Sequence, residues 1–329
     1  MDRHRIAAGQ ALPLLLALDF GGTKHTAAVI GPGERQWRAH RRVFSPSGAD
    51  ASYDIQTVLG MARELLGGGR PAAIGVSFGG PVDFRSGTVR LSHHVPGWEN
   101  MPLRAMLETE FSAPAAVDND ANVAALGEFH FGAGQGCASM MYITVSTGVG
   151  GGWVLNGQPW RGAEGMAGEI GHVVIDPAGP VCLCGKRGCV ERLASGPYMA
   201  QDARERLEHQ PARGQVLRAL AGNDPQVISG KLLAQAAAQG DDLAWEILER
   251  GARALGMGIG NAANLVNPDR FVLGGGVSKA GGRWWEVVRR IARETALPEV
   301  RIDVLPAALD DDAPLWGAVA LAQNCIKNS

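Results

Sequence analysis

The stretch LPLLLALDFGGTKHTAAVI (residues 12–30) predicts two strands joined by a tight glycine turn. The apolar run from Leu14 to Leu18 is typical of a buried strand, and Gly21 and Gly22 permit a sharp reversal because glycine adopts backbone conformations closed to other residues. A second stretch, MMYITVSTGVGGGWVLNG (residues 140–157), repeats the order of strand, glycine turn and strand. The repeat indicates that two parts of the chain share one plan.

Strands and helices alternate along the rest of the chain. We predict strands at residues 72–78, 114–120, 270–276 and 301–306. We predict helices at residues 52–66, from Pro102, at 121–131, over most of 192–263 and from Leu315. Alternation of this kind, with apolar strand interiors, indicates α/β layers, and 329 residues suit two domains with their own cores.

The composition excludes several classes of protein. Hydrophobic residues make up 46% of the chain and charged residues 19%, as in ordinary globular proteins, and the net charge of −2 lacks the basic excess that nucleic acid attracts. The N-terminal apolar run is too short to span a bilayer, so we expect neither a nucleic-acid nor a membrane partner. A secretory signal is the alternative interpretation of that run, but a cluster of free thiols favours the cytoplasm.

Three of the five cysteines lie close together in the sequence. Cys182, Cys184 and Cys189, with His172 ten residues before the first of them, offer the ligand set of a closed tetrahedral zinc site. Such a site leaves no open position for substrate, so we expect a structural Zn²⁺. Unrelated free cysteines in a glycine-rich loop and a disulfide pair are the alternatives.

Glycine turns that follow strands are candidate nucleotide-binding segments. Backbone N–H groups, a hydroxyl and a cation after a strand suit phosphate, and a third glycine turn allows a flat purine to lie against the backbone. A plain hairpin connection is the alternative for each turn taken singly. The candidate residues are Asp19, Gly21, Gly22, Thr23 and Lys24, then Ser146, Thr147 and Gly148, and finally Gly274, Gly275 and Gly276.

An acid is needed if phosphate is to be moved. Asp120 stands where a predicted strand meets the following helix, and the end of a strand exposes side chains to a crevice. Asp118, Asn119 and Asn122 make its surroundings polar. Capping of the helix by Asn119 or Asp120 is the competing interpretation.

These motifs resemble, in their order and spacing, the ROK family of bacterial sugar kinases and sugar-responsive repressors, over about residues 14–321. The motifs are DFGGTK (19–24), NDAN (119–122), STGVGGG (146–152), GEIGH (168–172), CLCGKRGCVE (182–191) and VLGGGVS (272–278). The resemblance implies an α/β protein with the actin-like ATPase fold (hexokinase-type, ribonuclease H-like), in which sugar and ATP bind in a cleft between two α/β domains. We expect a small domain over residues 1–122, completed by a helix at 312–329, and a large domain over 123–311 that carries the zinc loop 168–191.

The resemblance also implies an activity, the ATP-dependent phosphorylation of a hexose hydroxyl with Mg²⁺ accompanying ATP. Asp120 resembles the family's catalytic base, and zinc would be held by His172 and the three cysteines. The matching sugar-binding positions are Gly80, His94, Asn119, Asp120, Glu169, His172 and Glu191.

Sugar identity is where the sequence departs from the family pattern. His94, within SHHVPGW (92–98), stands where many members carry an asparagine that reaches the sugar. We expect glucose first, at its 6-hydroxyl, with N-acetylmannosamine, N-acetylglucosamine, allose and fructose as alternatives.

A sugar-sensing regulator without turnover is the alternative function. Related repressors carry about eighty extra residues with a helix-turn-helix before the first strand, whereas about thirteen precede it here, so we expect no DNA-binding domain. The aspartate of NDAN also favours turnover. Relatives are usually dimers, so we expect a homodimer or a homotetramer.

Overall fold

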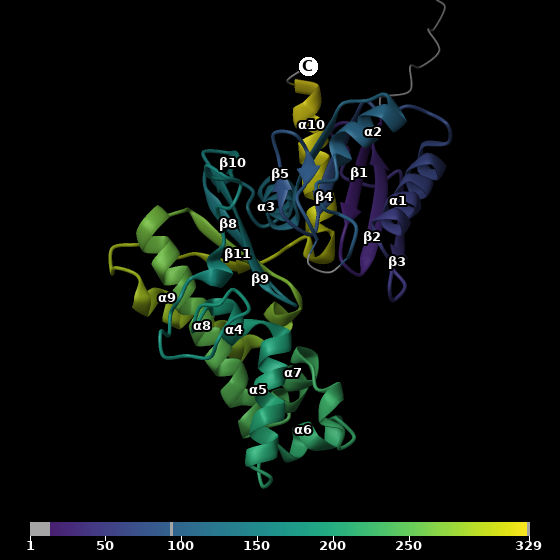
Figure 1. Cartoon of the computed structure of the whole chain (residues 1–329). Helices are drawn as coiled ribbons and strands as arrows, with labels where there is room; N and C mark the ends of the chain where they lie inside the picture. The colour runs from purple at the N-terminus through teal and green to yellow at the C-terminus, as the bar shows by residue number, and fades with distance from the viewer. Residues whose placement is uncertain (1–13, 93–94, 328–329) are drawn as a thin grey trace, which may run out of the picture. The chain divides into compact units, whose positions relative to one another are not determined.

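The computed structural model describes residues 14–92 and 95–327. Their contacts divide the chain into two compact units: unit 1 runs to Asp120 and resumes at Leu315, and unit 2 spans Ala121–Pro314. Each unit contains a five-stranded sheet with helices packed against it (Figure 1). Among the described residues, no helix is both long enough and apolar enough to cross a membrane.

Unit 1 is built on a mixed sheet with the strand order β3-β2-β1-β4-β7. β1 pairs antiparallel with β2 and parallel with β4, which in turn pairs parallel with β7. The strands are β1 (Leu15–Phe20), β2 (Lys24–Ile30), β3 (Ala39–Phe44), β4 (Ala73–Phe78) and β7 (Ala115–Asn119). Its other elements are α1 (Ala51–Leu66), α2 (Leu103–Phe111), α10 (Ala313–Lys327) and the short pair β5 (Val82–Asp83) and β6 (Thr88–Val89).

Both faces of the central strand β1 are covered, which explains its unbroken apolar run. Leu16 and Leu18 belong to the same core cluster as Val58 of α1. On the other face Gly75 of β4 touches α10 so closely that an added Cβ would lie 1.7 Å from the carbonyl oxygen of Ala318. Side chains alternate between the two faces of a strand, so only an all-apolar strand suits a sheet covered on both sides.

Unit 2 repeats the same sheet plan with the order β10-β9-β8-β11-β12. β8 pairs antiparallel with β9 and parallel with β11, as β1 does with β2 and β4. The strands are β8 (Met140–Val145), β9 (Val149–Leu155), β10 (Gln158–Trp160), β11 (Arg270–Gly274) and β12 (Val304–Pro306). The repeat of strand, turn and strand predicted from the sequence is confirmed, and so is the actin-like, ribonuclease H-like fold class.

The helices of unit 2 are α3 (Asp120–Phe131), α4 (Val190–Ala194), α5 (Gly196–His209), α6 (Gln215–Leu220), α7 (Gly230–Ala238), α8 (Asp242–Val266) and α9 (Gly282–Thr295), with short turns of helix η1 (Ile170–His172), η2 (Pro225–Val227), η3 (Gly276–Lys279) and η4 (Asp310–Asp312). The helices from α4 to α9 form a large apolar core with the sheet of this unit. Asp120, the first residue of α3, is the last residue of unit 1 before the division.

Some elements were not predicted. α9 is one, although Trp284, Val287, Val288 and Ile291 are buried at helical spacing. β3, with the sequence AHRRVF, lacks buried residues and therefore gives no clear strand pattern.

The glycines of residues 150–152 also differ from the prediction, because they lie inside β9 and not in the turn. An added Cβ on Gly152 would lie 2.5 Å from the carbonyl oxygen of Ala121, and one on Gly151 would lie 2.6 Å from that of Gly168. These glycines therefore allow neighbouring backbone to approach the strand, which is a packing role.

Candidate active site and metal centre

Three parallel strands of unit 1 end at one edge of its sheet and bring the predicted polar residues together there. Asp19 of β1 pairs in register with Ser77 of β4, and Ser77 pairs with Asp118 of β7. Asn119 ends β7 and Asp120 begins α3 directly after it. In open α/β sheets the carboxyl ends of the strands are the usual place for a ligand site.

Gly79, which follows β4, lies between the first glycine turn and Asp120. A Cβ built on Gly79 would lie 3.7 Å from the backbone nitrogen of Gly22 and 3.8 Å from Oδ2 of Asp120. The two predicted elements, the phosphate turn and the acid, therefore approach the same short stretch of backbone. Gly79 was not among the predicted site residues, although it follows a buried strand and stands beside Gly80.

Two other predicted residues of this edge contact each other. The side-chain amide of Asn119 donates to the carbonyl oxygen of Gly80 at 3.1 Å. This bond fixes the orientation of the amide. His94, the remaining predicted sugar residue of this region, lies outside the described residues.

The glycine turn between β1 and β2 leaves its backbone accessible. The Gly21 N–H donates to the carbonyl oxygen of Lys24 at 3.1 Å and closes the turn. Gly22 and Thr23 at its tip are exposed. Their N–H groups and the Thr23 hydroxyl suit an anion.

Asp19 is a buried carboxyl group beside this turn. Burial raises the pKa of Asp19 above its ordinary 3.8, and the Ser77 hydroxyl and the charges of Lys24, His25 and Arg42 oppose that rise only in part. An acid kept in such surroundings costs stability when it ionises, which is typical of functional positions.

The two predicted glycine turns of unit 2 lie next to each other. β8 and β11 are parallel neighbours, and the turns follow their ends. Gly275 has a φ of 85°, and a Cβ built on it would lie 2.4 Å from the carbonyl oxygen of Val145, the last residue of β8. Around Gly276 the space is open. A flat group has room against this backbone.

The first of these turns also meets Glu191 of α4. The Val149 N–H donates to Oε2 of Glu191 at 2.9 Å, and a Cβ on Gly148 would lie 2.8 Å from the same oxygen. Glu191 is therefore oriented by the start of β9.

Glu169 is part of the same neighbourhood. Burial and the charge of Glu191 raise the pKa of Glu169, while the nearby His172 lowers it. Glu169 is thus near enough to Glu191 and His172 for their charges to act on it. Ionised carboxylates accept hydrogen bonds, and a neutral imidazole both donates and accepts them.

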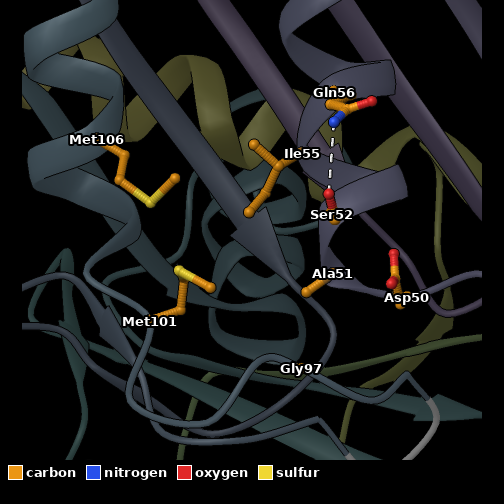
Figure 2. A pocket seen from close by; sticks show the side chains of 8 residues that line it. All are labelled: Asp50, Ala51, Ser52, Ile55, Gln56, Gly97, Met101 and Met106. Atoms are coloured by element: carbon orange, nitrogen blue, oxygen red, sulfur yellow. Dashed lines mark hydrogen bonds between the residues drawn. The ribbon is translucent and has the colours of Figure 1, made fainter.

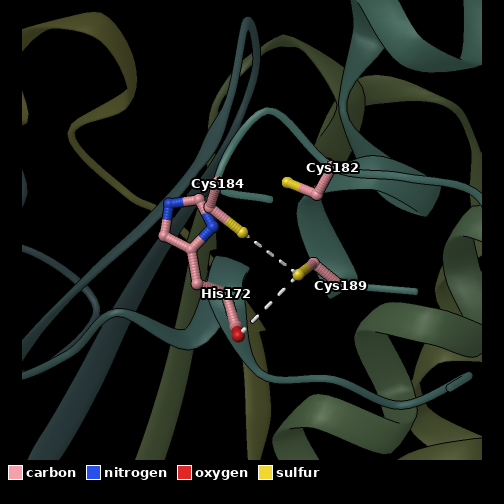
Figure 3. A group of neighbouring side chains, drawn as sticks. All are labelled: His172, Cys182, Cys184 and Cys189. Atoms are coloured by element: carbon pink, nitrogen blue, oxygen red, sulfur yellow. Dashed lines mark hydrogen bonds between the residues drawn. The ribbon is translucent and has the colours of Figure 1, made fainter. Parts of the chain in front are cut away.

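His172, Cys182, Cys184 and Cys189 form a cluster in which the ligand atoms all lie within 4.8 Å of one another (Figure 3). The Cys184 and Cys189 sulfurs are 3.6 Å apart. Two thiolates on a tetrahedral zinc ion, with Zn–S bonds of about 2.3 Å, would be about 3.8 Å apart, so the spacing fits that ion. Nδ1 of His172 is buried and has no hydrogen-bond partner, as a ligand nitrogen requires.

The loop is shaped by backbone bonds within it. The Cys182 N–H donates to the carbonyl oxygen of Lys186 at 2.8 Å, and the Gly185 N–H donates to that of Cys182 at 2.9 Å. A backbone hydrogen bond at Lys186 lowers the pKa of the Cys184 thiol to about 7, whereas burial and the Cys184 sulfur raise that of Cys189. Cys184 is thus the first thiol of this pair to ionise.

A cavity of about 390 Å³ in unit 1 lies apart from the predicted residues. Met101 and Met106 lie on one side of it, and the first turns of α1, with Ile55, lie on the other (Figure 2). None of the residues that line it belongs to the predicted site.

Comparisons with known proteins identify the family of this chain. The family model described as "ROK family" matches residues 15–325. The glucokinase of Streptomyces coelicolor is 34% identical over 314 residues, which cover 94% of this chain and 98% of that protein. The N-acetylmannosamine kinase of Shigella flexneri is 35% identical over 311 residues, with the same coverage of 94% and 98%.

A solved structure is similar over almost the whole chain. It is a ROK family glucokinase from Streptomyces griseus in complex with glucose and AMPPNP, with 34% identity, a TM-score of 0.79 and coverage of 94% of this chain and 99% of that one. The matched family model spans both sheets, the glycine turns and the cysteine cluster, and the chain belongs to the ROK family.

Proposed function

We propose that this protein transfers the terminal phosphate of ATP to a hydroxyl of a hexose, with glucose at its 6-hydroxyl as the first candidate. The observation that carries the proposal is the approach of Gly22 and Asp120 to Gly79, because it brings an anion-binding turn and a carboxylate to one place. Relatives named glucokinase and N-acetylmannosamine kinase support sugar phosphorylation as the reaction class. The complex of the Streptomyces griseus relative with glucose and AMPPNP supports sugar and ATP as substrates.

Asp120 acts as the general base in this proposal. Phosphoryl transfer has a loose transition state, so positioning and charge neutralisation contribute most, and the base removes a proton from the attacking hydroxyl. Asn119 and Gly80 would contact the sugar, and their mutual hydrogen bond holds the amide in place.

Backbone N–H groups of the glycine turns are proposed to bind the phosphates. The tip of the first turn, Gly22 and Thr23, is exposed. Asp19 beside it would orient the water shell of the Mg²⁺ that accompanies ATP. In unit 2 the turns at Ser146–Gly148 and Gly274–Gly276 would take the nucleotide, with the purine against the open backbone at Gly276.

Glu169, His172 and Glu191 are proposed to hold the sugar hydroxyls. Hydroxyls both donate and accept, so carboxyl groups and an imidazole match them. Figure 3 shows one ring nitrogen of His172 facing the cysteine sulfurs and the other facing away from them. One residue can thus serve the metal and a hydroxyl.

The residues of the cysteine cluster fit zinc by donor type and spacing, and we propose a structural Zn²⁺ held by His172, Cys182, Cys184 and Cys189. Bound there, zinc would supply a rigid cross-link between loop segments that have few regular elements. His172 and the neighbouring Glu169 and Glu191 would then be held ready for substrate.

The function is tested by a panel of hexoses assayed with ATP and Mg²⁺ in a coupled assay that detects ADP. We expect glucose to give the highest kcat/KM, with N-acetylmannosamine, N-acetylglucosamine, allose and fructose as comparisons. Higher kcat/KM for N-acetylmannosamine would change the substrate assignment. Binding of a hexose without ADP formation would instead identify a sugar-binding regulator.

Asp120→Asn tests the base. We expect kcat to fall roughly 10²- to 10⁴-fold, because the variant cannot take the proton, while calorimetry still detects sugar binding. Asp83→Asn in β5 makes the same chemical change elsewhere in unit 1 and should keep the wild-type rate. A near wild-type kcat for Asp120→Asn would remove the base assignment.

Asp19→Asn tests whether this carboxyl group is kept for function at the expense of stability. Because the pKa of Asp19 is raised by burial, the folded protein holds this proton more tightly than the unfolded chain does. Stability is therefore lost as pH rises from the ordinary pKa of 3.8 through the raised value. We expect Asp19→Asn to have a higher Tm than the wild type at pH 7 and a kcat lower by about tenfold or more.

The control for Asp19→Asn is to measure the Tm of the variant and of the wild type at a series of pH values. The gain in Tm should shrink as pH falls toward 4, because Asp19 then becomes protonated in the folded wild type. An equal gain at every pH would mean that ionisation of Asp19 is not its cause.

Cys184→Ser tests the metal centre. We expect metal analysis to find about one zinc ion per wild-type chain and little in the variant, together with weaker sugar binding. Cys137→Ser, outside the cluster, should keep both properties. Full zinc content in a Cys184→Ser protein that no longer binds sugar would separate the metal from the sugar site.

A further inference from the structure

The cysteine loop has an anchor that does not belong to the ligand set. The backbone N–H of Leu183, between Cys182 and Cys184, donates to the hydroxyl oxygen of Tyr198 at 3.0 Å. The side chain of Leu183 is 92% exposed and so contributes little packing. Tyr198 of α5 therefore holds this part of the loop through its backbone.

The ring of Tyr198 also contacts the helix that carries Glu191. The guanidinium group of Arg192, the next residue in α4, lies over the Tyr198 ring at 4.7 Å from its centre. Arg192 is 5% exposed and donates two hydrogen bonds to Asp202, at 3.1 and 2.9 Å, one turn beyond Tyr198 in α5. Planar stacking and a two-pronged ion pair leave the guanidinium group little freedom.

Asp202 is held from a second side by Arg250 of α8, which also donates to its carboxylate. A buried carboxylate with two arginine partners is fully paired. The group is therefore rigid, and removing one partner would lower the stability of the fold. The Tyr198 ring thus rests against a fixed support.

Tyr198 is half-buried, with its hydroxyl at the cysteine loop and its ring at α4. Burial raises the pKa of Tyr198, the Leu183 N–H lowers it, and the charges of Cys182 and Glu191 raise it further. Tyr198 thus contacts the loop through the backbone of Leu183, and α4 through Arg192, the neighbour of Glu191. Glu191 is itself bonded to the N–H of Val149 at the glycine turn.

We propose that Tyr198 is a positioning residue that couples the cysteine loop to Glu191, so that metal binding and sugar binding depend on each other through it. The inference rests on the proposed function, in which Glu191 holds a sugar hydroxyl and the loop holds zinc. Tyr198 itself touches neither substrate. Its hydroxyl fixes the loop, and its ring packs against Arg192, which Asp202 holds in place.

Tyr198→Phe tests the coupling, because it removes the hydroxyl and keeps the ring against Arg192. We expect the variant to lose zinc to a colorimetric chelator about tenfold faster than the wild type, as for other supporting groups of metal sites. We also expect the KM for glucose to rise by about threefold or more, with the KM for ATP and kcat unchanged within about twofold. A generally loosened fold would shift all of these values together.

Two variants serve as controls. Leu183→Ala keeps the backbone N–H that donates a hydrogen bond to Tyr198. It should therefore match the wild type in zinc release and in the KM for glucose. Tyr53→Phe makes the same chemical change in α1 of unit 1 and should also leave zinc release and the KM for glucose unchanged.

Three results would overturn the proposal: unchanged zinc release in Tyr198→Phe, faster release with an unchanged glucose KM, or equal impairment in Leu183→Ala. Failure of the proposed function is seen separately, as a wild-type protein that phosphorylates no hexose. The chelator measurement does not depend on that activity.

Discussion

The parallel register of β1, β4 and β7 is the constraint on which the candidate active site of unit 1 depends. Because these strands run in one direction and pair without offset, Asp19, Gly79 and Asn119 meet at a single edge of the sheet. Helices cover both faces of this sheet, so residues at the ends of its strands are the ones placed for a ligand. The same plan in unit 2 sets two glycine turns side by side after β8 and β11.

Glycine has a common physical role at these sites. At Gly75, Gly152 and Gly275 an added Cβ would lie within 2.5 Å of a backbone oxygen, so backbone segments pack closer than any side chain allows. At Gly22 and Gly276, in contrast, glycine leaves backbone exposed or space open. One residue type therefore serves tight packing in one place and ligand access in another.

The cysteine loop is held in place without a regular sheet or long helix of its own. Its segments before α4 have isolated β-bridges and one short turn of helix, which is little regular structure to hold Glu169 and His172. Instead, the loop gathers His172 and three cysteines, a cluster for which we propose zinc, and its backbone bonds to Tyr198. Rigid support of this kind matters because a side chain displaced by about 1 Å loses much of its contribution to binding and catalysis.

The sequence by itself determined the α/β class, the two repeats of strand, turn and strand, and the grouping of His172 with three cysteines, because these depend on local patterns of apolar residues, glycines and cysteines. It did not predict β3, whose residues are not buried, or the close contacts of Gly79. The tertiary structure alone decided that Glu191 bonds to Val149 and that Tyr198 bonds to Leu183, because these contacts join segments 42 and 15 residues apart. Such contacts follow from the packing of whole elements, which no local pattern encodes.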